Sequence, residues 1–277
     1  IKNIKIITPY NLDFKKDAVM DKAFSSAFEL LMLKILNTKD FEKVELTRLN
    51  VIKDMIISFE IIDEKFVNEN YSASINVLFD KKKILSFLDK QNLISSIPNE
   101  KKILFIPIII DLNNEELLMY EENKFFKNWN LNKKKHHLIN YVLPDEDIDV
   151  LNLIKKNQYN IENYDFKEIT EKYNDNEYII SIFFKNLDNI DILTKIKINK
   201  KLNILKLNFK NIDLNNVNSN EQLIDELKNQ FENIWKKSNQ INPSIKLPIT
   251  VSVDSKNLLL IKKFEDLLVS SDFVSEY

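Results

Sequence analysis

The chain has 277 residues, of which 44% are hydrophobic and 30% charged, and it carries a formal net charge of −2 with neither glycine nor cysteine. Without glycine it cannot form a phosphate-binding loop, a dinucleotide-binding turn or the nucleophile turn of the serine hydrolases, because each needs backbone that only glycine allows. Without cysteine it has no disulfides, thiol nucleophiles or thiolate metal sites.

Patterns of apolar residues predict an N-terminal α/β domain over residues 1–97. A helix that Asp13 can cap has apolar residues at three- and four-residue spacing. Asp80 is expected to cap a short helix that ends near Leu88. The expected elements are a strand at 1–9, helices at 13–36 and 41–55, strands at 56–66 and 71–79, and a helix at 80–88.

Residues 98–242 are expected to form a second, mixed α/β domain, which begins at the break around Pro98. Its first strand is continuously apolar, as strands buried on both faces are. Residues 219–222, Ser-Asn-Glu-Gln, have the pattern of a capping box. The expected elements are strands at 102–110, 137–143, 178–185, 190–198 and 202–209, the last three as an antiparallel meander, and helices at 121–129, 147–156, 166–173 and 219–237.

Residues 243–277 are expected to start a third unit, with a strand at 247–253, a helix at 257–268 and a strand from 272. This β-α-β unit stops on its last strand, so we expect it to be truncated. The chain begins at Ile1 rather than at methionine, which fits a secretory signal that has been removed. No apolar run reaches the roughly 18 to 20 residues of a membrane-spanning helix.

A chain without glycine must reverse direction on other residues, and its expected turns are rich in asparagine and aspartate. Asparagine tolerates the left-handed backbone conformation better than other non-glycine residues. We therefore expect positive φ angles mainly at asparagines of the turns at 68–70, 188–189, 199 and 215–216.

An acidic cluster after Pro144 is the main candidate for a metal site. Asp145, Asp147 and Asp149 lie at a strand-to-helix junction, where carboxylates can bind Ca²⁺ or Mg²⁺. Acidic residues also favour the first turn of a helix through its dipole, and this interpretation is preferred. His136 and His137 are not expected to share a metal, since neighbours on a strand point to opposite faces. The sequence therefore predicts neither a catalytic residue nor a cofactor.

Several segments of the first 180 residues form a recognisable pattern. They are residues 23–31 (AFSSAFELL), 57–60 (ISFE) followed by 63–64, 71–80 (YSASINVLFD), 103–107 (ILFIP) and 123–129 (NKFFKNW). The pattern resembles a family of bacterial, mostly proteobacterial, envelope proteins classed as a domain of unknown function. In this chain Lys124 and Phe125 stand where the family usually has Pro-Trp, and the glycines usual before Asp145 are absent.

The resemblance implies secretion to the periplasm and no known activity. We interpret Asn123, Phe126 and Trp129 as candidate residues for binding a partner. The sequence thus favours a non-enzymatic accessory or scaffold protein that binds other envelope proteins. Balanced charge and a single arginine, Arg48, argue against a nucleic-acid partner.

Two alternatives stay open at this point. One is a metal- or small-ligand-binding protein, or an enzyme, that uses the carboxylates between Asp145 and Asp149. The other is a designed sequence in which glycine was suppressed, which would keep the fold without a function.

Overall fold

The computed structural model describes residues 1–131, 133–173, 177–214, 216–240, 250–252 and 257–270. It divides into two compact units, and each is described by itself. Unit 1 comprises Ile1–Met32, Glu42–Ser95 and Gln240–Tyr277, and unit 2 comprises Leu33–Phe41 and Ser96–Asn239. Mixed sheets with several helices confirm the predicted α/β class.

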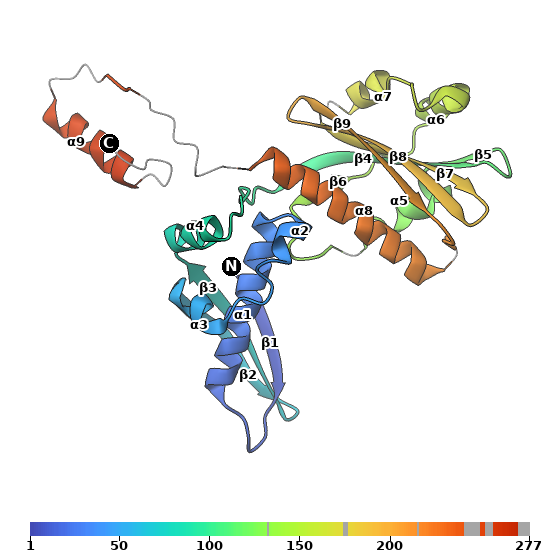
Figure 1. Cartoon of the computed structure of the whole chain (residues 1–277). Coiled ribbons are helices and arrows are strands. Elements are labelled where there is room, and N and C mark those ends of the chain that lie inside the picture. Colours follow the sequence, from blue (N-terminus) through green and yellow to red (C-terminus); the bar gives the residue numbers. More distant parts are fainter. Residues whose placement is uncertain (132, 174–176, 215, 241–249, 253–256, 271–277) are drawn as a thin grey trace. The chain divides into compact units, whose positions relative to one another are not determined.

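Unit 1 contains a three-stranded antiparallel sheet. Its strands are β1 (Ile4–Pro9), β3 (Asn70–Phe79) and β2 (Ile56–Val67), in that order, so β1 and β2 are the two edges. Alternate residues of β3, namely Tyr71, Ala73, Ile75 and Val77, are buried. Helix α1 (Lys16–Ile35) covers this face of the sheet (Figure 1). The alternation expected from the sequence therefore marks the face that packs on α1.

The helices after α1 agree with the predictions only in part. Helix α4 (Lys81–Lys90) is capped by Asp80, whose carboxylate accepts a hydrogen bond from the Lys83 N–H at 3.1 Å, as predicted. Helix α1 begins at Lys16, so Asp13 does not cap it.

The helix predicted over 41–55 is wrong, because α2 (Thr38–Phe41) and α3 (Leu49–Asp54) are separate. Thr47 Oγ1 donates to the Val44 carbonyl at 2.6 Å in the turns between them, and such local bonds compete with a continuous helix.

Unit 2 contains a six-stranded mixed sheet. Its central strand β4 (Lys101–Asp111) is parallel to β6 (Ile139–Val142) and β7 (Tyr178–Asn186) and antiparallel to β5 (Glu116–Leu118). Strands β7, β8 (Asn189–Ile198) and β9 (Lys201–Phe209) form the predicted antiparallel meander. Strand β5 was not predicted, since three residues give too short a pattern, and β6 begins two residues later than predicted.

Helices cover both faces of this sheet, which explains the continuous apolar run of β4. Helices α5 (Lys124–Asn128) and α8 (Val217–Ser238) pack on one face (Figure 1). Helices α6 (Ile148–Asn157) and α7 (Lys167–Lys172) pack on the other. The described part of this unit also contains α2 and two short 3₁₀ helices, η1 (Tyr120–Glu122) and η2 (Gln158–Asn160).

The predicted start of α8 is wrong. The helix begins at Val217 rather than at Ser219, because the Asn216 side chain accepts from the N–H groups of Asn218 and Ser219. Asparagine is as good an N-cap as serine.

The C-terminal region contains α9 (Leu258–Ser270), close to the predicted helix. The strand expected from 272 lies outside the described residues, as does most of that expected at 247–253; residues 250–252 form no strand. Among the described residues, no helix has both the length and the hydrophobicity needed to cross a membrane.

Two hairpins turn on pairs of residues with positive φ, as the glycine-free sequence predicts. Asn68 (50°) and Glu69 (59°) join β2 to β3, and Asn199 (50°) and Lys200 (63°) join β8 to β9. Pairs of this kind form the two-residue turn whose twist matches that of the strands. The expectation is thus confirmed at Asn68 and Asn199.

The other two turns differ from the expectation. Between β7 and β8 the positive φ lies on Leu187 (53°) and not at 188–189. Asn216 has φ −79° because it is a helix cap, and residue 215 lies outside the described residues. In the described part of the chain asparagine accounts for half of the positive-φ residues, namely Asn3, Asn68, Asn92, Asn199 and Asn211.

Candidate functional site

The predicted acidic cluster forms the start of a helix. Asp147 is the N-cap of α6, and its Oδ1 accepts from the N–H groups of Asp149 (2.8 Å) and Val150 (3.1 Å). Its Oδ2 accepts from Lys172 at 3.0 Å, and this bond lowers the pKa of Asp147. Asp145 and Asp149 are exposed. Within the described ranges, no three acidic, histidine or cysteine side chains are grouped so that they could hold a metal ion.

The three candidate partner-binding residues lie largely inside unit 2. Asn123 is fully buried, caps α5 by accepting from the Phe126 N–H (3.2 Å), and donates to the Pro107 carbonyl (3.0 Å). Trp129 is also fully buried and stacks on Phe105, with 3.9 Å between the ring centroids. Phe126 is partly buried. The interpretation of Asn123 and Trp129 as partner-binding residues is therefore corrected, since their side chains build the core and do not reach the surface.

The two adjacent histidines precede β6 instead of lying on it. Their rings meet edge to face, with centroids 4.8 Å apart. His137 is 3% exposed, and its Nε2 has no hydrogen-bond partner in the part of the chain that is described. Burial, with the nearby positive charges, lowers the pKa of His137 to about 3 and that of His136 to about 4. Both rings are therefore neutral at pH 7.

A row of buried ionisable residues on α8 was not predicted. Lys228, Glu232 and Lys236 follow each other at four-residue spacing, and none is more than 6% exposed. The spacing is visible in the sequence, but such residues at such spacing are typical of an exposed helix face. Burial lowers the pKa of Lys228 to about 8 and raises the pKa of Glu232.

Each member of this row binds backbone. Lys228 Nζ donates to the Trp129 carbonyl and Lys236 Nζ to the Leu33 carbonyl, both at 2.6 Å. Glu232 Oε1 accepts from the N–H groups of residues 138 and 139, both at 2.9 Å. The three side chains thus hold three chain segments against α8, so their role is to stabilise the fold.

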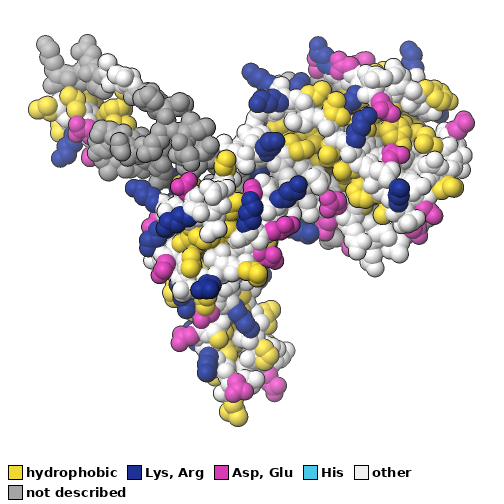
Figure 2. Space-filling view, viewed as in Figure 1, with side chains coloured by type: hydrophobic (Ala, Val, Ile, Leu, Met, Phe, Trp, Pro, Cys, Tyr) yellow, Lys and Arg dark blue, Asp and Glu magenta, His cyan; other side chains and the backbone are white. Residues whose placement is uncertain are grey.

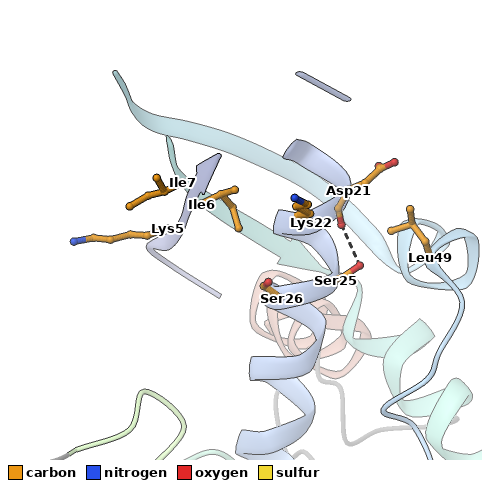
Figure 3. Close-up of a pocket in the computed structure, with 8 residues that line it drawn as sticks. All are labelled: Lys5, Ile6, Ile7, Asp21, Lys22, Ser25, Ser26 and Leu49. Atoms are coloured by element: carbon orange, nitrogen blue, oxygen red, sulfur yellow. Dashed lines mark hydrogen bonds between the residues drawn. The ribbon is translucent and has the colours of Figure 1, made fainter. Parts of the chain in front are cut away.

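A shallow surface groove lies beside β1 in unit 1 (Figure 3). It is lined by three consecutive residues of β1, four residues of α1 and one of α3: Lys5, Ile6, Ile7, Asp21, Lys22, Ser25, Ser26 and Leu49. Ile6 lies opposite the buried Ala73 and so faces α1, whereas Ile7 is 72% exposed. The groove therefore has one apolar side chain on the α1 side of the strand, with polar residues of α1 around it.

In the part of the chain that the structure describes, β3 is the only strand beside β1, so the outer edge of the β1 backbone is open along this groove. The Tyr10 N–H donates to the Glu69 carbonyl at 2.7 Å. In an antiparallel ladder the bonded residues alternate, so residues 4, 6 and 8 bond to β3 in the same way. Lys5 and Ile7 then direct their N–H and C=O groups to the open edge, which agrees with their place in the lining of the groove.

The charges around the groove are predominantly positive. Asp21 forms an ion pair with Lys53 of α3. Lys5 and Lys22 are exposed and form no ion pair with any residue that the structure describes. On the face shown in Figure 2, basic and acidic side chains are otherwise interspersed over both units. The groove therefore offers backbone groups that no described residue pairs, with the ammonium group of Lys22 on its α1 side and that of Lys5 on the opposite face of β1 (Figure 3).

Two comparisons with known proteins find no match for this chain. No protein-family model matches it, and a search of curated proteins finds no significant match.

Proposed function

We propose that the chain is a non-enzymatic accessory or scaffold protein of the periplasm that binds other envelope proteins through the groove beside β1. The observation that carries the proposal is an open edge strand next to a groove whose other wall is a helix. Peptide-binding domains use this arrangement to add an extended segment of the partner to the sheet. The envelope location is supported by the sequence resemblance of residues 71–80 and 103–107.

The geometry indicates what kind of segment fits. Its backbone would pair with Lys5 and Ile7, and the pairing would end at Pro9, which has no N–H to donate. Side chains on one face of the segment would approach Ile6 and Lys22, and those on the other face would approach Lys5. An extended segment with acidic side chains is therefore the best match for the groove.

A substitution at Ile7 tests this proposal. Ile7→Pro removes the outward N–H and places a ring on the open edge, which edge strands tolerate in the fold but which blocks pairing. Ile7→Thr is the matched control, because it also shortens the exposed side chain but keeps the N–H. The unaltered chain and both variants are crosslinked in the native envelope, and the captured proteins are compared, with thermal unfolding as a check of folding.

The proposal expects specific partners to be captured by the unaltered chain and by Ile7→Thr, and to be lost with the folded Ile7→Pro variant. Equal capture by all three chains would overturn the role of the groove. Capture of no specific protein by any of them would count against the protein-binding function itself.

A further inference from the structure

The second edge of the three-stranded sheet is open as well. Strand β2 has 12 residues and, in the described part of the chain, only β3 beside it. Apolar side chains on it are exposed, with Ile57 at 61%, Phe59 at 49% and Phe66 at 57%. A long, partly apolar edge is a place where another strand can pair.

A bulge in β2 brings Phe59 and Phe66 to the same face of the sheet. Phe59 lies opposite Val77 and Phe66 opposite Tyr71, and both partners on β3 are buried under α1, so the two phenylalanines share one face. Their odd separation in sequence would place them on opposite faces of a regular strand. The irregularity between Ile61 and Asp63 supplies the extra residue that brings them to the same face.

The same bulge aligns two opposite charges on the other face. Glu60 lies opposite Asn76 and Lys65 opposite Ser72, which are residues of the face away from α1. Within the described ranges Glu60 has no ion-pair partner. The other two acidic residues of β2 are neutralised, Glu64 by Lys16 at 2.8 Å and Asp63 by Lys65 at 2.7 Å.

We propose that two copies of the chain pair antiparallel along β2, with Phe59 opposite Phe66 and Glu60 opposite Lys65 of the second copy. A single register brings both pairs of residues opposite each other. Because the dimer is symmetric, each pair occurs twice. Aromatic and opposite-charge pairs across neighbouring strands are stabilising. The pairing places Glu60 beside Lys65 of the second copy, whose ammonium group also bonds Asp63 of its own chain and would then be shared by the two carboxylates. It also covers the exposed faces of both phenylalanines.

The bulge does not oppose this pairing. Bulges commonly protect an edge because a straight strand cannot follow them. In this register the bulge lies at the centre of the symmetric pair, so both strands carry the extra residue at the same level. The inference is independent of the proposed function, since it uses β2 and leaves β1 and its groove free.

Charge reversal tests the register. Glu60→Lys replaces two attractive pairs between the copies by two repulsive ones and leaves the Asp63–Lys65 pair in place. Lys65→Glu does the same between the copies but also removes the Asp63–Lys65 pair. The double variant restores the attraction between the copies with the signs exchanged. Glu45→Lys and Lys82→Glu are controls of equal charge change at exposed positions of the same unit. The oligomeric state is measured by sedimentation velocity over a concentration series.

The proposal expects a monomer–dimer equilibrium for the unaltered chain and both controls, a dissociation constant at least about tenfold higher for each single variant, and recovery in the double variant. A single monomeric species up to about 1 mM would overturn the proposal. A dimer that responds to the β2 variants no more than to the controls would overturn it too.

A crosslink gives a second, independent readout. The chain contains no cysteine, so Ser58→Cys in one copy and Val67→Cys in another are the only thiols in a mixture of the two variants. The register places these positions opposite each other, and we expect a disulfide between the two different variants under mild oxidation. Disulfides that form equally fast within each variant alone would contradict the register.

Discussion

Leu187 shows at the scale of one residue what the absence of glycine costs. It holds φ at 53° in the turn between β7 and β8 and is 70% exposed, so packing does not compensate for its conformation. The left-handed conformation costs a residue with a branched side chain about 1–2 kcal/mol. Asparagine tolerates the same conformation more readily.

We therefore predict that Leu187→Asn raises the free energy of unfolding by about 0.5–1 kcal/mol, measured by urea denaturation. Asn199→Leu, in a turn where asparagine already occupies the left-handed position, is expected to lower it by a similar amount. A loss of stability in Leu187→Asn would show that the turn depends on the leucine side chain.

His137 makes stability depend on pH. Its pKa is about 3 in the folded chain, below the value of 6.5 expected when unfolded, so its contribution is complete above pH 6.5 and is lost as the pH falls toward 3. The slope is about 1.4 kcal/mol per pH unit while only the unfolded ring is protonated. We predict that His137→Leu removes about this slope between pH 6 and 4 in denaturation curves; equal slopes would contradict the burial of a neutral ring.

At the scale of elements, Glu232 fastens the beginning of β6 to α8. Glu232→Ala leaves the buried N–H groups of Leu138 and Ile139 without an acceptor, and we predict a loss of about 2–4 kcal/mol in unfolding free energy. Glu232→Gln keeps an acceptor and removes the buried charge, so it should cost less than about 1 kcal/mol. Equal losses in chemical denaturation would show that the charge itself is required.

Substitutions of Asp147 distinguish a helix cap from a metal site at the start of α6. Asp147→Ala should lower the unfolding free energy by about 1 kcal/mol, and Asp147→Asn should retain most of it, because asparagine also caps helices. Ca²⁺, Mg²⁺ or Zn²⁺ should leave the melting temperature of the unaltered chain unchanged. If any of these cations raised the melting temperature of the unaltered chain but not that of Asp147→Ala, the carboxylates would form a metal site after all.

At the scale of the whole molecule, the elements with the strongest local patterns could be predicted. The β2–β3 and β8–β9 hairpins turn on asparagine, and β3 has alternating apolar residues. The continuously apolar β4 is covered by helices on both faces. The break between α2 and α3 could not be predicted, because the apolar pattern does not show local bonds such as that of Thr47, which compete with a continuous helix.

The candidate sites were harder to predict from the sequence than the fold. Lysine and glutamate on α8 look solvent-exposed in the sequence, and only the chain segments that return to α8 bury them. The groove beside β1 depends on strand order, which places a short N-terminal strand at an edge next to α1. Residue types in the sequence do not report strand order, so the lining residues Lys5 and Lys22 could not be singled out.

The central claim, that β1 receives an extended segment of a partner, is tested most directly by hydrogen exchange at the backbone N–H groups of Lys5 and Ile7. The probes are two short peptides, one alternating glutamate with valine and one alternating lysine with valine. The account predicts fast exchange at both amides in the free chain, and exchange slowed about tenfold or more at saturating acidic peptide but unchanged with the basic one. Protection of these amides in the free chain, or their unchanged exchange at saturating acidic peptide, would contradict it.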